Sequence, residues 1–340
     1  MRKYSIAFFI TLALIALAGC AKQTETDMTE PNRQAFEAWV KKYYPDATRT
    51  PMGVYIVEDT PGTGKLFSSG DDTPFVRMEY TTRTLDGEIT GYTSAAIAKQ
   101  LAEFNEAGYY GPKIFYRGND NSYVGLNESI SEMREGGHRK IIVPGWLMTY
   151  KRYDTLEEYI KNVSASASIY DFTLTEGIQD IDQWEVDSIG RYLSHHFPQK
   201  SLSDTTMFGF YYIQTQAPKT TVAFKSDTTF YINYTGRRLD GQVFDSSIRD
   251  TAEFYGINNG GDYSTVLINC GETYTDYTMT SDKSSMIQAF AYCLAQMKDG
   301  EKGTCIFISS LGYSDSGSGD VIPPFSPLRF DIEVVPKTEE

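Results

Sequence analysis

Residues 229–247 read TFYINYTGRRLDGQVFDSS, the most informative segment of this 340-residue sequence. Phe230, Ile232 and Tyr234 alternate with more polar neighbours, which is the pattern of a strand with one buried face. The dipeptide Asp240-Gly241 follows, and such a pair favours a tight turn before the next apolar residues. The segment therefore predicts an antiparallel β-hairpin.

Two later segments extend this pattern. They read MIQAFAYCLAQMKDGEKG at residues 286–303 and LGYSDSGSGDVIPPFSPLRFDIEVV at residues 311–335. In this order and spacing, the three segments resemble the FKBP-type peptidyl-prolyl cis-trans isomerase domain. The resemblance covers about residues 205–336 and implies a proline-binding pocket in that part of the chain.

The resemblance also implies which side chains form the pocket. The residues expected to carry the catalysis are Tyr234, Phe244, Asp245, Ile287, Phe290, Tyr313 and Phe330. The residues expected to bind substrate are Met286, Val321 and Ile322, with one further wall residue that is either Tyr277 or Phe254. The choice stays open because an insertion near residues 250–276 lies between Phe244 and Met286. Counting forward from Phe244 gives Phe254, and counting backward from Met286 gives Tyr277.

Individual roles follow from the same resemblance. Ile287 is expected to offer its backbone N–H to one substrate carbonyl, and the Tyr313 hydroxyl to bond another. Asp245 is expected to organise Tyr234, because a carboxylate beside aromatic side chains needs hydrogen-bond donors. Phe290 stands where the family usually has a tryptophan, so the ring is kept and the indole N–H is lost.

The chemistry expected of such a pocket is rotation about the X–Pro amide bond. That bond has partial double-bond character and isomerises slowly, over a barrier of about 20 kcal/mol. A twisted amide has less charge separation than a planar one, so an apolar pocket that excludes water favours it. This reaction needs no nucleophile, metal or cofactor, and none is expected.

An internal repeat predicts a second copy of the same fold. VRMEYTTRTLDGEI at residues 76–89 parallels FYINYTGRRLDGQV at residues 230–243. The earlier copy changes the pocket positions: Thr82 replaces Gly236, Thr90-Gly91 replaces Phe244-Asp245, and Leu126 replaces Phe290. We therefore expect the first copy to keep the scaffold and to have a degenerate, catalytically silent pocket.

The expected fold class is α+β, with two tandem FKBP-like domains. Each would be an antiparallel sheet wrapped around a short helix and preceded by an N-terminal helix. The first of these helices is indicated by the helical spacing of apolar residues ahead of Pro45: Phe36, Trp39, Val40 and Tyr44. The expected boundaries are 33–182 for the degenerate domain and 183–336 for the isomerase domain, which carries the insertion.

The first residues resemble a bacterial lipoprotein signal. Two basic residues precede a short apolar run that is too brief to span a bilayer, and Leu17-Ala18-Gly19 leads directly to Cys20. Residues 1–19 are therefore expected to be a signal peptide, Cys20 the lipidated residue, and residues 20–32 a flexible tether. This predicts attachment to the cell envelope, with the outer membrane as the expected site and the side of exposure open.

Composition and charge limit the classes of molecule that the chain is expected to bind. The chain has 45 acidic and 31 basic residues, a net charge of −14, which makes nucleic acid an unsuitable partner. Cys270, Cys293 and Cys305 have no metal-site spacing, and Cys293 and Cys305 are expected to be small core residues. Proline-containing polypeptides are the expected clients, and the sequence does not indicate an oligomeric state.

Two functions fit these patterns. The first is a membrane-anchored prolyl isomerase that assists protein folding in the envelope. The second is a lipoprotein that uses the same groove to hold clients or a partner protein without turnover. Catalysis should require Asp245 and Tyr313, whereas client holding should tolerate their loss if the apolar walls remain.

Overall fold

The computed structural model describes residues 29–67, 74–118, 122–257, 263–279 and 283–336. The chain divides into two compact units, Met1–Pro45 and Asp46–Glu340, and each is considered by itself. The expected signal peptide, Cys20 and most of the tether lie outside the described residues. Within the described ranges, no helix combines the length and the apolar character needed to cross a membrane.

The described part of the first unit is helix α2, Thr29–Tyr43. Phe36 and Val40 stand four positions apart and so share one face of the helix. The Trp39 ring lies 5.0 Å from that of Tyr43 and 5.8 Å from that of Tyr44. The helical spacing read from these apolar residues is confirmed.

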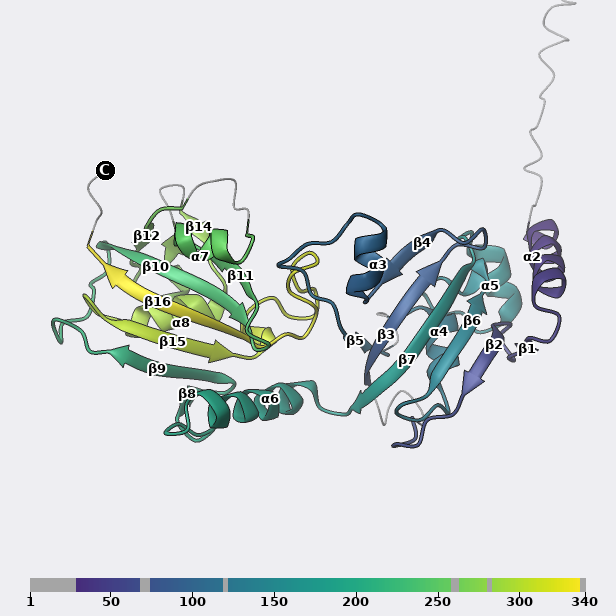
Figure 1. Ribbon diagram of the computed structural model, residues 1–340, viewed down its shortest axis with the longest axis horizontal. Coiled ribbons are helices and arrows are strands. Elements are labelled where there is room, and N and C mark those ends of the chain that lie inside the picture. Colours follow the sequence, from purple (N-terminus) through teal and green to yellow (C-terminus); the bar gives the residue numbers. More distant parts are fainter. Residues whose placement is uncertain (1–28, 68–73, 119–121, 258–262, 280–282, 337–340) are drawn as a thin grey trace, which may run out of the picture. The chain divides into compact units, whose positions relative to one another are not determined.

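The second unit contains two antiparallel sheets in succession along the chain (Figure 1). The first has the order β1-β2-β6-β7-β3-β4, with β5 also paired to β3. Its strands are β1 Thr48–Arg49, β2 Tyr55–Thr60, β3 Phe75–Arg83, β4 Ile89–Tyr92, β5 Lys113–Tyr116, β6 His138–Val143 and β7 Ser168–Ile178. With helices α3 Ala95–Gln100, α4 Val124–Ile130 and α5 Leu156–Asn162, it forms what we call the first repeat.

The second sheet has the order β14-β13-β12-β10-β16-β15-β9-β8, with β11 also paired to β10. Its strands are β8 Thr205–Met207, β9 Phe210–Gln216, β10 Thr229–Arg238, β11 Val243–Ser246, β12 Val266–Asn269, β13 Thr278–Met279, β14 Ser284–Ser285, β15 Lys302–Phe307 and β16 Leu328–Val335. With helices α6 Ile181–His196, α7 Arg249–Phe254 and α8 Gln288–Gln296, it forms the second repeat.

The two repeats share a topology. The order of the first sheet, β2-β6-β7-β3, matches the order of the second, β9-β15-β16-β10. In the first sheet β3 also pairs with the short strands β4 and β5, and in the second β10 also pairs with the short strands β11 and β12. The register agrees as well: Thr82 lies opposite both Gly91 and Tyr170, as Gly236 lies opposite both Asp245 and Phe330. The α+β class and the tandem arrangement expected from the sequence are therefore confirmed.

The Asp-Gly turn expected after β10 is present. Gly241 has φ +92°, a left-handed conformation that glycine adopts without strain. The Arg238 N–H donates to the Gln242 carbonyl at 3.0 Å and closes the turn. This connection fixes the register of β10 against β11, the strand that carries Phe244 and Asp245.

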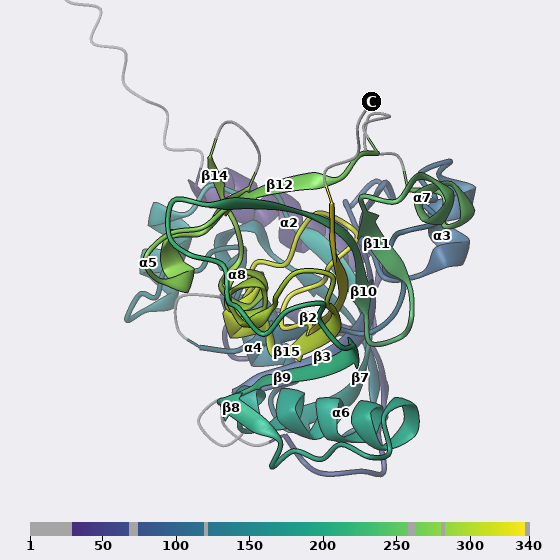
Figure 2. The same cartoon turned by 90° about the vertical axis from the view of Figure 1, so that its left-hand side faces the viewer.

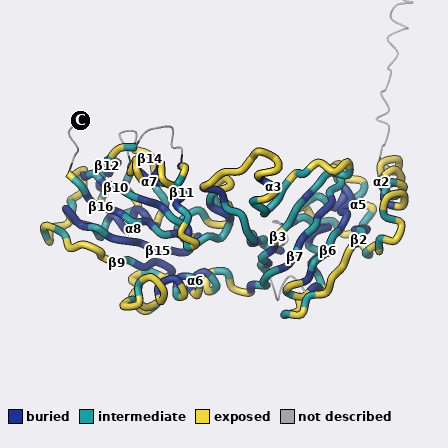
Figure 3. The backbone as a smooth tube through the Cα atoms, viewed as in Figure 1, coloured by how far each residue is buried: buried dark blue, intermediate teal, exposed yellow. Residues whose placement is uncertain are grey.

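The core of the second repeat lies between the sheet and α8. Leu328, Phe330, Ile332 and Val334 are buried at alternate positions of β16, as the two-residue period of a strand requires. The dark-blue positions in Figure 3 show this burial along the central strands. Figure 2 shows α8 within the curve of the sheet, where its Phe290 and Leu294 join the same cluster.

Helix α6 covers the other side of β9 and β15. Val186, Ile189 and Leu193 follow helical spacing and pack in one buried cluster with Tyr211 and Ile306. The Asp180 carboxylate caps the helix by accepting from the Gln183 N–H at 3.0 Å. The N-terminal helix is thus an integral part of the second repeat.

One carboxylate of α6 is buried. Glu185 has 0% exposure and accepts hydrogen bonds from the Ser309 N–H at 2.5 Å and the Ser309 hydroxyl at 2.6 Å. Burial raises the pKa of Glu185 to about 7, although both bonds act in the opposite direction. The contact ties α6 to the 3₁₀ turn η3, Ser309–Leu311, which leads directly to Tyr313.

The cysteines of the second repeat are core residues, as expected for Cys293 and Cys305. Cys270, Cys293 and Cys305 are free thiols with at most 5% exposure. Cys293 on α8 lies beside Cys305 on β15, and burial raises the pKa of the Cys293 thiol well above its usual value. The Cys293 thiol is therefore protonated at neutral pH, and both buried cysteines act as small apolar groups.

The insertion near residues 250–276 folds onto the second sheet. It supplies α7, strand β12, which pairs with β10, and the 3₁₀ turn η2, Tyr274–Asp276. Ala252 and Ile257 pack with Val243 in a small buried cluster. Residues 258–262 of the insertion are outside the described ranges.

Candidate functional site

Four aromatic rings from four elements meet on the inner face of the second sheet. The Phe330 ring lies 5.6 Å from Phe244, 5.0 Å from Phe290 and 6.1 Å from Tyr234, measured between centroids. Tyr234 and Phe290 are 5.5 Å apart. Most of these contacts are edge-to-face, the favourable arrangement for aromatic pairs, so the rings form one continuous apolar surface.

Gly236 makes the close approach of these rings possible. A Cβ atom at this position would lie 2.7 Å from both Cε2 and Cζ of Phe244, and 2.9 Å from Cε1 of Phe330. These distances are below normal carbon contact, so any side chain here displaces a ring. The glycine between Thr235 and Arg237 is therefore required by the site.

Polar groups meet at one edge of the rings. The Tyr234 hydroxyl donates to Asp245 Oδ2 at 2.7 Å. Burial and the Asp245 charge raise the pKa of Tyr234, and the same two causes raise the pKa of Tyr313. Both tyrosines are therefore neutral donors at physiological pH, with the carboxylate of Asp245 close to each.

The N-terminus of α8 contributes a backbone donor. Ile287 is the N-cap residue, so its N–H has no partner within the helix. Ile287 and Met286 are half-buried and pack against the cluster that contains Phe290. Among the described residues the Tyr313 hydroxyl makes no hydrogen bond, so this side of the site has an O–H and an N–H to offer a ligand.

A glycine-rich segment forms another wall, and we call residues 314–322 the flap. Within it the Gly317 N–H donates to the Tyr313 carbonyl at 3.0 Å, and the Ser318 N–H donates to the Ile322 carbonyl at 2.7 Å. Ile322 at its end has 3% exposure and joins the aromatic cluster, whereas Val321 packs with the insertion. The flap is thus an ordered turn with one apolar end.

The two alternatives for the last wall residue lie in different surroundings. Tyr277 has 8% exposure and belongs to the buried cluster that contains Phe290 and Phe330. Phe254 is 81% exposed on α7, and its ring contacts Tyr255. The structure brings Tyr277 together with the expected site residues and leaves Phe254 outside them.

Comparison with known proteins places the chain in a family. The model of the FKBP-type peptidyl-prolyl cis-trans isomerases matches residues 220–335. FK506-binding protein 2 of Dictyostelium discoideum is 30% identical over 115 residues, which cover 34% of this chain and 69% of that protein. The chain belongs to the FKBP-type peptidyl-prolyl cis-trans isomerase family.

Two other relatives match this chain over a smaller share of their own length. The macrophage infectivity potentiator of Trypanosoma cruzi is 30% identical over 104 residues, or 31% of this chain. A probable FKBP-type peptidyl-prolyl cis-trans isomerase of Haemophilus influenzae is 30% identical over 121 residues, or 34% of this chain. The present chain spans 40% and 39% of these two proteins.

The first FKBP-like repeat has other side chains at the equivalent positions. The Thr82 and Thr90 hydroxyl oxygens are 3.0 Å apart, and a Cβ at Gly91 would lie 2.8 Å from Thr82 Oγ1. Thr82 therefore occupies space that Gly236 leaves open in the second repeat. Leu126 on α4 holds the sequence position of Phe290 and is buried.

Sequence reasoning missed two residues next to this FKBP site. Phe307 on β15 stacks on Phe330 at 5.9 Å between ring centroids, and the continuous apolar run Cys305–Phe307 at the end of β15 was the signal that could have indicated it. Arg238, at the end of β10, is 6% exposed and contacts the flap. No local pattern indicates this arginine, because its partners lie about 80 and 130 residues away.

Proposed function

We propose that this chain is a peptidyl-prolyl cis-trans isomerase that acts through the pocket of its second repeat. The observation that carries the proposal is the cluster of four aromatic rings bordered by Asp245, Tyr313 and the N-cap residue Ile287. Family membership supports the same reaction class. In this proposal the first repeat does not turn over substrate.

The site suggests how the reaction proceeds. The proline ring lies on the apolar bed, where the twisted amide is favoured over the planar one because it carries less charge separation. The Ile287 N–H and the Tyr313 O–H bind the flanking carbonyls and hold the peptide in one orientation. Asp245 fixes the Tyr234 hydroxyl, so the aromatic wall keeps its position. A barrier lowered by about 4 kcal/mol would accelerate the rotation roughly a thousandfold.

We place this activity at the bacterial cell envelope, on a lipid anchor at Cys20. The support is the sequence around Leu17–Cys20, which resembles a lipoprotein cleavage site. The clients in this proposal are unfolded or folding polypeptides that contain proline. Labelling of the chain by a radioactive fatty acid in cells, lost in Cys20→Ser, is the corresponding test.

The activity itself is tested with residues 21–340 and a short X–Pro peptide. We expect measurable acceleration in the wild type, and a reduction in kcat/KM of roughly tenfold in both Asp245→Ala and Tyr313→Phe, since each removes a hydrogen bond or a charge at the site. Tyr150→Phe in the first repeat is the matched control and should keep full activity. Equal activity in Tyr313→Phe and the wild type would place the reaction elsewhere.

A second candidate function is client holding without turnover, and the exposure of Phe254 favours it. This ring is 81% exposed at the end of α7, which follows shortly after β11 with its Phe244 and Asp245. An exposed aromatic near an apolar site adds area for an unfolded chain to bind. The two functions share the groove and differ in the need for Asp245 and Tyr313.

Phe254→Ser separates the two functions. We expect this variant to keep peptide turnover but to need about three times more protein to suppress aggregation of an unfolded client, because apolar contact area is lost. Light scattering of a reduced, unfolded protein at several ratios gives the measurement. Ser264→Ala, a change at another exposed position of the insertion, is the control.

A further inference from the structure

A loop of the first repeat lies against the rim of the proposed pocket. Residues 105–110, which we call the brace, follow α3 and are shaped by their own hydrogen bonds. The Ala107 N–H donates to Asn105 Oδ1 at 3.0 Å, and the Asn105 N–H donates to the Tyr110 hydroxyl at 2.9 Å. The Tyr110 ring stacks on Phe104 at 5.3 Å. The brace is therefore a structured turn.

Apolar packing attaches the brace to the second repeat. Ala107 has 5% exposure and lies in one buried cluster with Val243, Ala252 and Ile257, against which Val321 also packs. Val243 directly precedes the pocket residues Phe244 and Asp245, and Val321 directly precedes Ile322. The alanine of the brace thus belongs to the same cluster as residues that adjoin two parts of the site.

Arg238 connects the brace, the flap and the turn after β10 by hydrogen bonds. Its Nη1 donates to the Ala107 carbonyl at 3.0 Å and to the Val321 carbonyl at 2.6 Å. Its Nε donates to Asp240 Oδ2 at 3.1 Å, and the guanidinium lies 5.3 Å from the Tyr109 ring centroid. A planar guanidinium with several donors suits such a junction, where a lysine has a single point charge.

A direct backbone bond completes the attachment. The Tyr109 N–H donates to the Asp320 carbonyl at 2.7 Å, at the tip of the flap. Further along, the Phe75 ring of β3 meets the Phe325 ring edge-on at 5.3 Å. The flap and the segment after it are therefore held by the first repeat at points on both sides of Ile322.

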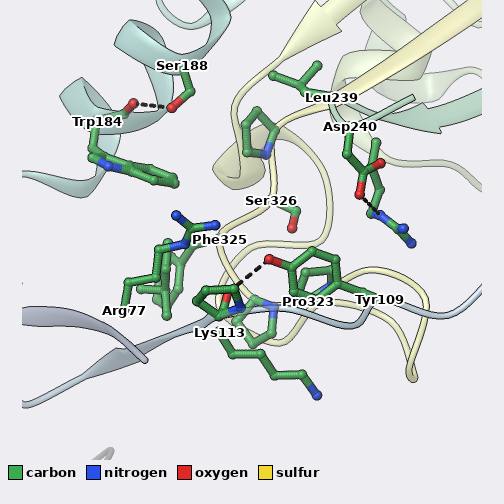
Figure 4. A pocket seen from close by; sticks show the side chains of 15 residues that line it. Arg77, Tyr109, Lys113, Trp184, Ser188, Leu239, Asp240, Pro323, Phe325 and Ser326 are labelled. Carbon is green, nitrogen blue, oxygen red and sulfur yellow. Dashed lines mark hydrogen bonds and ion pairs between the residues drawn. The ribbon is translucent and has the colours of Figure 1, made fainter. Parts of the chain in front are cut away.

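The segment after the flap has little other support on one side. Residues 323–327 border a cavity of about 190 Å³, which also has Arg77, Tyr109 and Trp184 in its wall (Figure 4). Atoms that line a void lose packing contacts on that side. The segment after the flap therefore packs less fully on the side of this cavity.

We propose that the first repeat acts as an internal clamp on the isomerase pocket, with Arg238 as the positioning residue. The brace holds the flap, which carries Val321 and Ile322, at a fixed separation from β11, which carries Phe244 and Asp245. The mouth of the pocket thereby keeps one width before a peptide arrives, and binding does not have to order the flap. This inference rests on the proposed isomerase function for its consequence, and on the contacts above for its geometry.

The test uses residues 21–340 with three variants. Arg238→Gln removes the guanidinium that bonds the Ala107 and Val321 carbonyls, and Arg238→Lys keeps the positive charge without the guanidinium. Ala107→Asp is a change in the first repeat that places a carboxylate in the apolar cluster. Arg83→Gln, on an arginine of the first repeat that bonds the Gly87 carbonyl, is the matched control. Two quantities are measured: hydrogen exchange of the flap amides, and kcat and KM for an X–Pro peptide.

We expect Arg238→Gln and Ala107→Asp to speed exchange of the flap amides about tenfold, which is the effect of losing one charged hydrogen bond or its equivalent. KM should rise several-fold with kcat nearly unchanged, because the flap must now be ordered on binding. Arg238→Lys should lie between these variants and the wild type, and Arg83→Gln should match the wild type.

Two results would overturn the clamp: flap exchange that equals the wild type in both variants, or exchange that rises evenly over the whole second repeat, which indicates general destabilisation. Exchange needs no catalysis, so it decides the clamp even if the wild type fails to turn over the peptide. That failure would instead remove the proposed function.

Discussion

Gly236→Thr is expected to reduce kcat/KM for an X–Pro peptide by roughly 100-fold. The added Cβ would lie 2.7 Å from Phe244 and 2.9 Å from Phe330, so at least one ring must leave the bed. Overpacking of this kind also costs about 1–3 kcal/mol of folding stability. The first repeat has Thr82 at the position equivalent to Gly236, so the variant gives the second repeat the side chain of the first.

The matched control is the reverse change, Thr82→Gly, which should leave peptide turnover unchanged. Thermal unfolding of both variants separates a lost pocket from a lost fold. A Gly236→Thr protein that is folded and retains wild-type turnover would show that Phe244 and Phe330 do not need to meet at this strand. In that case the proline would have to bind elsewhere.

The second large effect is a loss of stability of about 3 kcal/mol as the pH rises from about 4.5 to about 7. It comes from Glu185, whose pKa is about 7 in the folded chain against an ordinary value of 4.5. The folded state holds this proton more tightly than the unfolded state, so the contribution is fully present below pH 4.5. It decreases through the interval and is gone above pH 7.

Denaturant unfolding of the wild type and Glu185→Gln between pH 4 and pH 8 measures this contribution as a difference. The glutamine cannot titrate, but its side-chain oxygen can still accept from the Ser309 N–H and hydroxyl. The wild type should therefore lose stability relative to the variant as the pH rises. Glu157→Gln, on an exposed acid in the first turn of α5, is the control and should leave the pH profile of the wild type unchanged. Parallel curves for the wild type and Glu185→Gln would contradict the prediction.

Much of the fold follows from local patterns. The alternation around Tyr234, the Asp-Gly turn and the helical spacing before Pro45 each depend on neighbours in the sequence, and each has the expected structure. The duplication was also readable, because strands that repeat a fold repeat their apolar pattern. These features use information from a few adjacent residues.

The rest depends on contacts between distant residues. Counting along the chain could not decide between Tyr277 and Phe254, because the insertion adds α7 and β12 and changes the count on one side. Arg238 meets the Ala107 carbonyl 131 positions away, and Glu185 meets Ser309 124 positions away. A buried charge is rare and has no sequence signature of its own, so neither role could be predicted.

The strand order of the second sheet has a consequence for how the chain is made. Strand β16 follows every other strand of its sheet in the sequence, yet it lies between β10 and β15 in the middle of that sheet. It also brings Phe330, the ring that touches the other three. Because Gly236 pairs with Phe330 across 94 residues, this closure is a long-range step and slow to form. Until β16 enters, β10 and β15 have no partner strand between them, and the four-ring site that we propose to bind proline lacks its central ring.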